Sequence, residues 1–555
     1  MTLSSAIAGA AWMSTNIAGY YRYRAALSDP AVTQEAILKH YLRANADTAF
    51  GRAHRFPLIR SVDEYQASVP LASYADFSQS IDDIWIGKQA ILTRDPVRSL
   101  ALSSGSVSAA KRIPYTARLQ REFRRAIAPW VADLYRGRPQ LILGSSYWSI
   151  TPVARDPTPE PGVIPVGFEE DGEYLGAVWK RLVDATLAVP GAVRFVRDVD
   201  AFRYVTLLFL LRRPDLSLVS VWHPSFLTLL LDALPLNWDS LIKDVRGGTI
   251  DPPSGLPAAI ERDLRSGLRP NPRRAEELAA VGPEDYTAIW PRLQLVSCWA
   301  DGHAAFSLRT LRRMLPGVQI QPKGVLATEA VVTLPFQGLM PLAVRSHFFE
   351  FLREGRTYLA HQLVPGEVYS VVVTTGGGLY RYRLEDRIEV DGFVQRTPSL
   401  RFLGKEDCVS DLCGEKLNET FVAGALDQAC ARFRVAPRCA LVAPDLSGVP
   451  QGYTLYLETD AEPPPALSGL LDEYLASNPH YRYCRTLGQL APVRLFHVTG
   501  SMFSLYLSRC RDLGQRLGDV KPIALSPKAG WSDVFPGHYL VESADVRRPA
   551  STTSL

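Results

Sequence analysis

Three polar segments, each close behind an apolar run, carry residue types that can bind a phosphorylated ligand. The first is Ser103-Ser-Gly-Ser-Val-Ser108, which Lys111 follows. Hydroxyl groups and closely spaced backbone N–H groups around a glycine concentrate hydrogen-bond donors without bulky side chains, and Lys111 adds positive charge. This composition suits a polyphosphate, and it is equally typical of a solvated turn.

The second and third segments offer groups for a metal ion and for a ribose. Gly324-Val-Leu-Ala-Thr-Glu-Ala330 places Thr328, whose hydroxyl can contact a phosphate, beside Glu329, whose carboxylate can ligate Mg²⁺. Tyr380-Arg-Tyr-Arg-Leu-Glu-Asp386 ends in an acidic pair suited to ribose hydroxyls. Taken singly, the pattern at Thr328-Glu329 also fits an ordinary helix start, and the pattern that ends at Asp386 also fits a solvated strand end.

Strands and helices alternate in the part of the chain that must position these groups. Apolar residues at helical spacing predict helices in residues 1–60 and again in 225–231 and 275–280. Short β-rich runs bounded by turn residues predict strands at 97–102, 140–143 and 216–221. The alternation of these strands with the helices indicates an α/β fold.

Between residues 335 and 405 the pattern changes to hairpins. Residues 366–383, with the turn Gly376-Gly377-Gly378 at the centre, predict one hairpin, and residues 387–394 around Asp391-Gly392 predict another. A domain boundary is predicted near Thr397-Pro398. We therefore expect a large N-terminal domain with a β-rich portion, a hinge, and a small mobile α/β lobe. The predicted limits are 1–396, 397–405 and 406–555.

Composition narrows the class of protein. The 555 residues are 47% hydrophobic and 21% charged, which is ordinary for a globular protein and excludes disordered, collagen-like and coiled-coil classes. Lys plus Arg number 61 against 57 Asp plus Glu, so a net charge of +4 gives no support for nucleic-acid binding. Seven scattered cysteines fit a reducing compartment, and the apolar run at 205–211 is too short to cross a bilayer. We expect a cytoplasmic protein with neither nucleic acid nor membrane as partner.

In this order along the chain, the segments resemble the acyl acid–amido synthetase family first known from auxin-responsive plant proteins, particularly its bacterial members. That family belongs to the adenylate-forming superfamily, with acyl-CoA synthetases, peptide-synthetase adenylation domains and luciferase. The likeness runs through nearly the whole chain and is strongest at residues 366–386. Other matching segments are 50–51, 69–74, 87–93, 147–150, 224–227, 348–351, 402–404, 414–417 and 518–522.

The resemblance implies an ATP site with Mg²⁺. By its motifs, Thr328 and Glu329 contact the α-phosphate and Mg²⁺, and Asp386 binds the ribose. The chain departs from the family pattern with a single glycine in the phosphate loop, and with Glu385 where a glycine is common. The residues that match the loop for the β- and γ-phosphates are Ser103, Ser104, Gly105 and Ser106, with Lys111 beside them. The residues that match catalytic lysines of the mobile lobe are Lys416 and Lys521.

The implied activity is the formation of an acyl-AMP from a small carboxylic acid, followed by transfer of the acyl group to an amine, expected to be an amino acid. A second interpretation is an acyl-CoA ligase or a similar enzyme with a thiol acceptor. A third is a catalytically inactive binding protein, which the joint presence of the expected acidic residues and lysines argues against. Three aromatic residues near matched motifs are candidates for an acyl pocket, although such residues are more often core. They are Trp148, Phe226 and Trp299.

Overall fold

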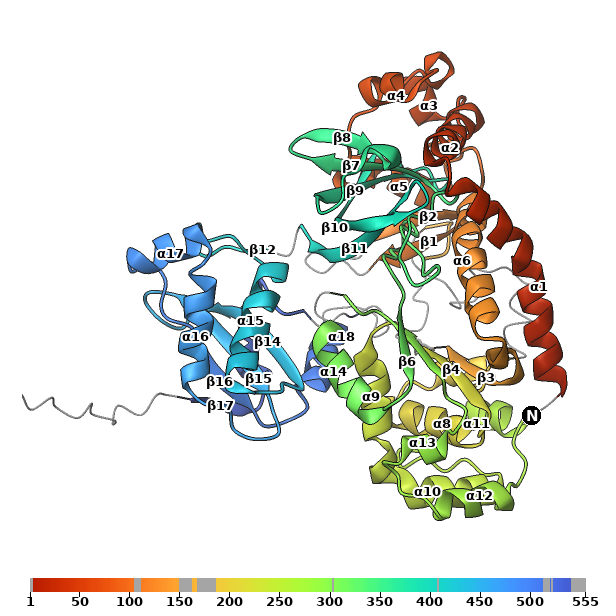
Figure 1. Cartoon of the computed structure of the whole chain (residues 1–555), viewed down its shortest axis with the longest axis vertical. Helices are drawn as coiled ribbons and strands as arrows, with labels where there is room; N and C mark the ends of the chain where they lie inside the picture. Colours follow the sequence, from red (N-terminus) through yellow and green to blue (C-terminus); the bar gives the residue numbers. More distant parts are fainter. Residues whose placement is uncertain are drawn as a thin grey trace, which may run out of the picture. The chain divides into compact units, whose positions relative to one another are not determined.

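The computed structural model of the chain describes residues 3–103, 111–148, 162–166, 186–301, 304–406, 409–512, 520 and 523–540. Two compact units divide the chain. The first comprises Met1–Glu406 with Gly514–Lys521, and the second comprises Asp407–Leu513 with Pro522–Leu555. Helices and strands alternate in both, so the predicted α/β class is confirmed (Figure 1).

Helices form the N-terminal part of the first unit, as the sequence predicts. The two longest, α1 and α6, lie side by side (Figure 1), and a Cβ at Gly19 would come within 2.8 Å of the Ala128 Cβ. Glycine at that point therefore allows the close approach of the two helices. The helices are α1 (Leu3–Ala26), α2 (Pro30–Ala44), α3 (Ala49–Ala53), α4 (Val62–Ser68), α5 (Tyr74–Trp85) and α6 (Ala117–Gly137), with the 3-10 turn η1 (Phe56–Leu58).

A parallel sheet with the strand order β3-β4-β5-β6 follows. Parallel neighbours need a long crossover, and helices supply the crossovers between these strands. The strands are β3 (Ser145–Trp148), β4 (Leu216–Ser220), β5 (Leu295–Cys298) and β6 (Gln319–Pro322). The helices of this region are η4 (Gly191–Phe195), α8 (Val199–Leu211), α9 (Pro224–Asp232), α10 (Leu234–Gly247), α11 (Ala258–Arg265), α12 (Pro272–Ala279), α13 (Tyr286–Ile289) and α14 (Ala304–Met314).

The strand predicted at residues 140–143 is wrong. These residues lie in the 3-10 helix η2 (Pro139–Leu143), and β3 begins only at Ser145. Pro139 lacks an N–H group and has a fixed φ, which suits the first position of a helix. The strand predicted at 216–221 and the helices predicted at 225–231 and 275–280 are confirmed as β4, α9 and α12.

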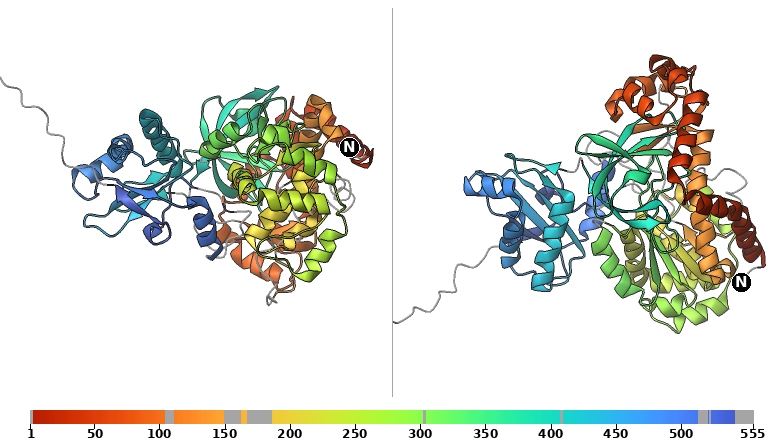
Figure 2. Two further views of the ribbon diagram at one scale, coloured as in Figure 1. Left: turned by 90° about the horizontal axis from the view of Figure 1, so that it is seen from below. Right: turned by 45° about the horizontal axis from the view of Figure 1, so that its top comes forward.

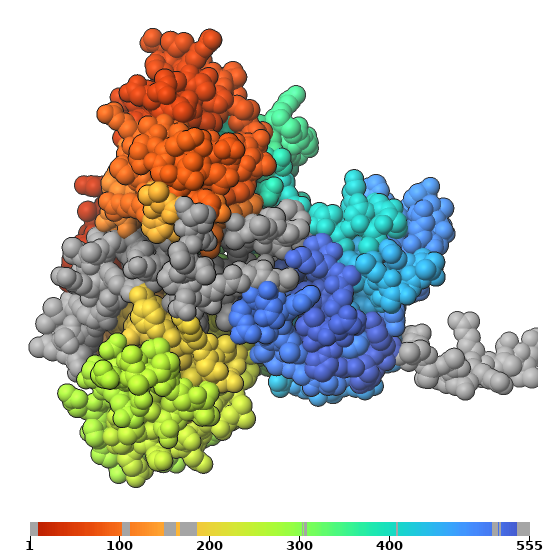
Figure 3. All heavy atoms as spheres, turned by 180° about the vertical axis from the view of Figure 1, so that it is seen from behind, coloured from red at the N-terminus to blue at the C-terminus, as the bar shows by residue number. Residues whose placement is uncertain are grey.

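Helices pack on both faces of the parallel sheet. The face that carries Val219 and Val296 contacts α8, α9, α10 and α12, and the face that carries Leu218 and Leu295 contacts α1 and α6. Figure 2 shows the helices of the first face (yellow to green) and the pair α1 and α6 (red and orange) on opposite sides of the sheet. In the space-filling view of Figure 3, the segment from α2 to α5 (red to orange) and the helices of the first face (yellow to green) occupy opposite ends of the first unit.

A five-stranded antiparallel sheet completes the first unit, in the order β11-β10-β9-β7-β8. Its hairpin from β9 to β10 is the one that the sequence predicts around Gly376–Gly378. The second predicted hairpin is wrong, because β10 runs through Asp391-Gly392 with only a shift in register, and the chain turns at Gln395. Residues 397–405, predicted as a hinge, form β11 and pair with β10. The strands are β7 (Phe348–Arg353), β8 (Arg356–Leu359), β9 (Val368–Thr374), β10 (Tyr382–Val394) and β11 (Thr397–Lys405), with the turn η5 (Ala360–Gln362).

The second unit has a mixed sheet in the order β14-β15-β16-β17, parallel only between β15 and β16. Two helices, α15 and α16, pack beside each other over this sheet (Figure 1). The strands are β12 (Val409–Ser410), β13 (Leu417–Asn418), β14 (Cys439–Asp445), β15 (Gly452–Glu458), β16 (Arg494–Val498) and β17 (Gly537–Leu540). The helices are α15 (Glu419–Phe433), α16 (Ala466–Leu475), α17 (Pro479–Thr486), α18 (Met502–Asp512) and η7 (Trp531–Asp533).

In the part of the chain that the structure describes, no helix combines the length and the apolar character needed to span a lipid bilayer.

Candidate active site

A two-stranded hairpin fixes both ends of the predicted phosphate loop. β1 (Val97–Ser103) pairs with β2 (Lys111–Thr116) in antiparallel register, and Ser103 lies opposite Lys111. The other loop residues, Ser104, Gly105 and Ser106, fall outside the described residues. The two paired ends nevertheless show where the loop must leave the sheet and return to it.

Lys111 joins the hairpin to the next part of the site. Its Nζ lies 4.0 Å from Glu385 Oε2 and 6.0 Å from the centre of the Tyr74 ring. Both side chains of the ion pair are partly exposed, so the contribution of the pair to stability is small. The contact matters for position, because it brings the first residue after the predicted phosphate loop beside Glu385, at the acidic end of the segment 366–386.

Glu329 lies in a tight turn and is almost fully buried. Leu326 and Val331 form an antiparallel bridge, and the N–H of Ala327 donates to the carbonyl of Ala330 at 2.9 Å. The side chain of Glu329 is thereby held at the tip of a turn rather than at the start of a helix, and the residue is only 7% exposed. Thr328 precedes it and is half-buried.

The charge of Glu329 is set by burial and by three neighbours. Burial raises the pKa of its carboxyl group, Lys405 and Lys111 act in the opposite direction, and Asp386 raises the pKa further. The Tyr382 hydroxyl donates to Oε1 over a long 3.5 Å. A buried carboxylate beside a second carboxylate is a costly arrangement that a divalent cation relieves, and oxygen ligands of this kind suit Mg²⁺. The donor set therefore fits the metal that the resemblance implies.

A buried histidine ties the Glu329 turn to helix α6. The N–H of Val331 donates to His347 Nε2 at 3.3 Å, so Nδ1 carries the proton and donates to Glu122 Oε2 at 3.1 Å. Glu122 also accepts a hydrogen bond from the N–H of Gly376 at 2.9 Å. These contacts fix the turn between α6 and the β9–β10 connection.

Asp386 faces Lys405 across the two last strands of the antiparallel sheet. The residues are paired in the register of β10 with β11, and Lys405 Nζ lies 3.3 Å from Asp386 Oδ1. The same ammonium group donates to the carbonyl of Leu384 at 3.3 Å. Asp386 is only 5% exposed. Sequence reasoning found Asp386 and missed Lys405, because the partnership depends on strand register.

Glu385 explains one departure from the family pattern. Its φ is +62°, in the left-handed region that favours glycine, and the pairing of β10 with β9 shifts between Arg383 and Arg387. The carbonyl of Glu385 accepts from the N–H of Glu406 at 2.7 Å. This backbone shape is the physical reason why a glycine suits the position, and the chain adopts it with a glutamate instead.

The predicted acyl-pocket residues lie at or near the carboxyl ends of the parallel strands. Trp148 ends β3, and Trp299 directly follows β5. Trp299 stacks obliquely on Trp222, with 5.6 Å between ring centres, and Lys323 lies over both Trp222 and Trp148. Phe226 lies in the first turn of α9 and is half-buried. The sequence did not single out Trp222, two residues after β4, or Lys323, directly after β6.

Of the two lysines predicted in the C-terminal part of the chain, the structure describes Lys416 and does not describe Lys521. Lys416 is exposed, has a φ of +47°, and lies between the paired strands β12 and β13 of the second unit. Its neighbour Glu415 is buried and accepts from the N–H groups of Leu412 and Cys413 at 2.7 and 2.8 Å, and from the Tyr453 hydroxyl. Burial opposes ionisation, but these bonds hold the pKa of Glu415 below its ordinary value. Lys521 lies outside the described residues.

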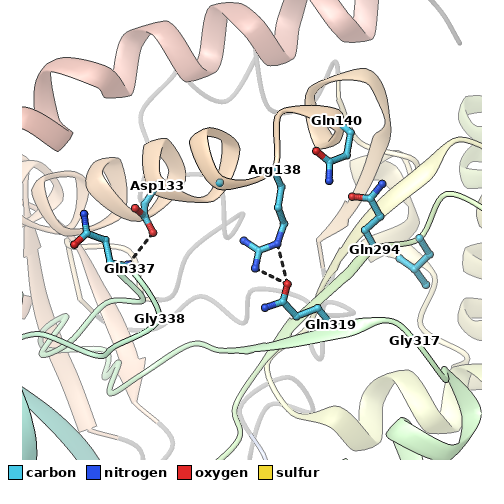
Figure 4. Close-up of a pocket in the computed structure, with 10 residues that line it drawn as sticks. Asp133, Arg138, Gln140, Gln294, Gly317, Gln319, Gln337 and Gly338 are labelled. Atoms are coloured by element: carbon cyan, nitrogen blue, oxygen red, sulfur yellow. Dashed lines mark hydrogen bonds between the residues drawn. The ribbon is translucent and has the colours of Figure 1, made fainter.

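A hollow of about 640 Å³ lies elsewhere, at the amino ends of the parallel strands β5 and β6 (Figure 4). Arg138 Nε donates to Gln319 Oε1 at 3.0 Å, and the N–H of Gln337 donates to Asp133 Oδ2 at 3.0 Å. None of the predicted site residues lines it. Ligands of open α/β sheets bind at the carboxyl ends of the strands, so this hollow lies at the opposite edge.

Three family domains match successive parts of the chain. The GH3 family N-terminal domain matches residues 20–320, the GH3 family central domain matches 340–405, and the GH3 family C-terminal domain matches 421–529. The chain belongs to the GH3 family. This confirms the family that the motifs predict and the class of enzyme, an adenylate-forming ligase that joins an acid to an amine.

Individual members of the GH3 family resemble the chain over most of its length. A probable indole-3-acetic acid-amido synthetase of Oryza sativa is 26% identical over 455 residues, 72% of this chain and 73% of the relative. A probable indole-3-acetic acid-amido synthetase of Arabidopsis thaliana is 26% identical over 457 residues, 77% of this chain and 76% of the relative. The solved structure of the GH3.15 acyl acid amido synthetase superposes with a TM-score of 0.82 at 20% identity, covering 93% of this chain and 94% of the other. The fold of the GH3 enzymes is therefore the fold of this chain.

Proposed function

We propose that this GH3 protein is a cytoplasmic, Mg²⁺-dependent enzyme that uses ATP to join a small carboxylic acid to an amino acid. The carboxylate oxygen of the acid attacks the α-phosphorus of ATP, the bond from that phosphorus to the bridging oxygen breaks, and pyrophosphate leaves. The product is an acyl-AMP, in which AMP replaces the poor leaving group of a free acid. Curated relatives named as indole-3-acetic acid-amido synthetases support this choice.

Two lysines and one glutamate serve the first step. Lys111 lies at the foot of the phosphate loop and Lys405 lies beside Asp386, so both bring positive charge to the region of Glu329. Negative charge develops on the departing pyrophosphate, and fixed cations stabilise it most where water is excluded. Glu329 would hold Mg²⁺, which offsets phosphate charge and assists departure. Thr328 and the loop of Ser103, Ser104, Gly105 and Ser106 would donate to phosphate oxygens.

Asp386 serves as the nucleotide anchor. Its carboxylate would accept hydrogen bonds from the two ribose hydroxyl groups, while Lys405 orients it from the neighbouring strand. Hydrogen bonds to a charged acceptor contribute about 1.5–3 kcal/mol. Asp386 therefore fixes where the α-phosphate meets the acid.

The second step transfers the acyl group. The neutral amine nitrogen attacks the acyl carbon, the bond from that carbon to the AMP oxygen breaks, and the nitrogen loses a proton. Lys416 and Lys521 are assigned to the first step or to the adenylate by their motif positions, and Trp148, Phe226 and Trp299 to the acid. An amine acceptor is favoured over a thiol, because the curated relatives are named for amide formation.

The single observation that carries this proposal is the convergence of Lys111, Glu329, Asp386 and Lys405 at one place in a GH3 fold. The test is a pyrophosphate-release screen of carboxylic acids with ATP and Mg²⁺, repeated with a panel of amino acids and with coenzyme A. We expect pyrophosphate with a subset of acids, and an amide product with an amino acid. A thioester product with coenzyme A and no amide with any amine would overturn the choice of acceptor.

A further inference from the structure

A second group of side chains, apart from the nucleotide site, lies on one face of the parallel sheet. Trp148, Ser220, Ser297 and Gln321 are paired in register across the four strands, so their side chains share that face. The same alternation continues past the strand ends to Trp222, Trp299 and Lys323, because the backbone bonds from Trp299 to Trp222 and from Lys323 to Cys298 prolong the ladder. The carboxyl edge of the sheet thus gathers aromatic rings around one cation.

The ammonium group of Lys323 is held by both an oxygen and aromatic rings. Its Nζ lies 2.7 Å from Ser220 Oγ, and 5.4, 5.9 and 5.3 Å from the ring centres of Trp130, Trp148 and Trp222. The face of an indole attracts a cation within about 6 Å, so these rings favour the charged form of the lysine. The four side chains are half-buried rather than enclosed in the core.

Two buried polar atoms without a hydrogen-bond partner among the described residues lie on the same face of the sheet. Ser297 is fully buried, and among the described residues its Oγ has no hydrogen-bond partner. The Trp148 Nε1 is likewise buried and unpartnered there. Buried polar groups are nearly always hydrogen-bonded, so an unsatisfied hydroxyl and indole N–H beside a fixed cation indicate a place for the polar atoms of a ligand.

Lys323 acts on a different part of the molecule from the nucleotide site. Lys323 is held by Ser220 of β4 and lies over tryptophan rings of α6, of β3 and of the residues after β4. Glu329 instead accepts from Tyr382 of the antiparallel sheet. A carboxylate that is to react with ATP must reach the Glu329 region. The anionic group that Lys323 would meet is therefore a different one.

We propose that Lys323, Ser220 and the surrounding tryptophans select a flat aromatic acid that carries a second anionic group remote from the reacting carboxylate. The proposal rests on the proposed function, because it names the substrate class of that acid. The rings of Trp130, Trp148 and Trp222 would contact the body of the acid, and the Lys323 ammonium would pair with the second carboxylate. Monocarboxylic acids with the same ring lack that ion pair.

The test compares matched acids in two assays. Benzoate, naphthalene-2-carboxylate and indole-3-acetate are each paired with a derivative that carries one more carboxylate on the ring. Binding is measured by quenching of tryptophan fluorescence without ATP, and turnover is measured by pyrophosphate release. The variants are Lys323→Met, which removes the charge, and Lys323→Arg, which keeps it. Lys39→Met is the matched control, because Lys39 is an exposed residue of helix α2 that forms a surface ion pair with Glu35.

We expect the native protein to bind at least one dicarboxylate about 10-fold or more tightly than its partner, since a charge-assisted bond contributes about 1.5–3 kcal/mol. Lys323→Met should remove that preference, because it weakens binding of the dicarboxylate by about 10-fold more than binding of the monocarboxylate. Lys323→Arg should retain most of the preference for the dicarboxylate, and Lys39→Met should retain all of it. Thermal unfolding of each variant separates loss of the ion pair from loss of fold.

Equal weakening of both members of every pair by Lys323→Met, in a folded protein, would overturn the inference, and so would a native protein without preference in any pair or without measurable binding. If the preference is present and depends on Lys323 but no acid releases pyrophosphate, the proposed function fails and the anion site stands. If pyrophosphate is released without any preference, the inference fails and the proposed function stands.

Discussion

Asp386 and Lys405 face each other across strands β10 and β11, with 3.3 Å between Oδ1 and Nζ. The pair is fixed by strand register rather than by a flexible loop, so both charges are in place before a nucleotide arrives. Preorganised charge is what makes electrostatic stabilisation effective, because no reorganisation is needed at the moment of reaction. The pair also connects the proposed ribose anchor, Asp386, to the environment of Glu329, whose pKa both residues influence.

Asp386→Asn should raise the KM for ATP by about 10- to 150-fold, which corresponds to about 1.5–3 kcal/mol for hydrogen bonds to a charged acceptor. The asparagine keeps the shape of the side chain and removes its charge. Steady-state kinetics at saturating acid measure the effect. Asp391→Asn is the matched control, because Asp391 is an exposed carboxylate in the same strand. An unchanged KM for ATP in Asp386→Asn would assign this residue to the strand-end ion pair alone.

Glu385→Gly should stabilise the protein by about 1 kcal/mol, because the residue has a φ of +62° and a side chain is strained in that region. The lost contact with Lys111 is partly exposed at 4.0 Å and offsets little of the gain. Chemical denaturation measures the difference. Glu385→Ala is the control, since it removes the same carboxylate and keeps the strain. Equal stability of the glycine and alanine variants would refute the explanation by backbone strain.

Glu329→Gln should stabilise the protein in the absence of Mg²⁺, and the gain should grow as the pH rises above the pKa of a glutamate in the unfolded chain. Burial raises the pKa of Glu329 in the folded state, so ionisation of this group costs stability as the pH rises above the pKa of the unfolded chain. Differential thermal melts against pH measure the trend, with exposed Glu276→Gln as the control. The same variant should lose adenylation activity. A gain that shrinks with rising pH would contradict the sign of this argument.

Lys521→Ala should reduce acyl-AMP formation by a factor on the order of 10²–10³ and leave amide formation from synthetic acyl-AMP nearly intact. Pyrophosphate departure develops charge that an ammonium group stabilises, whereas attack by an amine on a formed adenylate needs it less. Separate assays of the two half-reactions measure this. Lys416→Ala in parallel shows whether the two lysines share the step. Equal loss in both half-reactions would refute the division of labour assigned to Lys521.

Local patterns in the sequence predicted most elements of the fold but not their ends. Helical spacing located the N-terminal helices, α9 and α12, and the glycine-rich turn located the β9–β10 hairpin. The second predicted hairpin failed because Asp391-Gly392 can form a turn or a bulge, and the partner strand β11 decides which. Tertiary pairing therefore overrode turn propensity at that point.

Some residues of the proposed site could be predicted from local motifs, and others depend on strand pairing. Glu329 and Asp386 stand in short motifs, so their proposed roles could be predicted from neighbouring residues. Lys405 and Lys323 stand in no such motif, and their proposed roles depend on which strands lie beside them. An isolated lysine in a sequence is most often a solvated surface group, and only strand register distinguishes these two.

The most direct measurement is product analysis with ATP, Mg²⁺, an accepted acid and an amino acid. The proposed function predicts AMP and pyrophosphate in equal amounts, with one amide formed for each AMP once the amino acid is present. It also predicts pyrophosphate release from acid and ATP alone, limited to about one turnover where the acyl-AMP stays bound. Formation of ADP and phosphate instead would require an acyl-phosphate intermediate, and would contradict the roles assigned to Glu329, Asp386 and the phosphate loop.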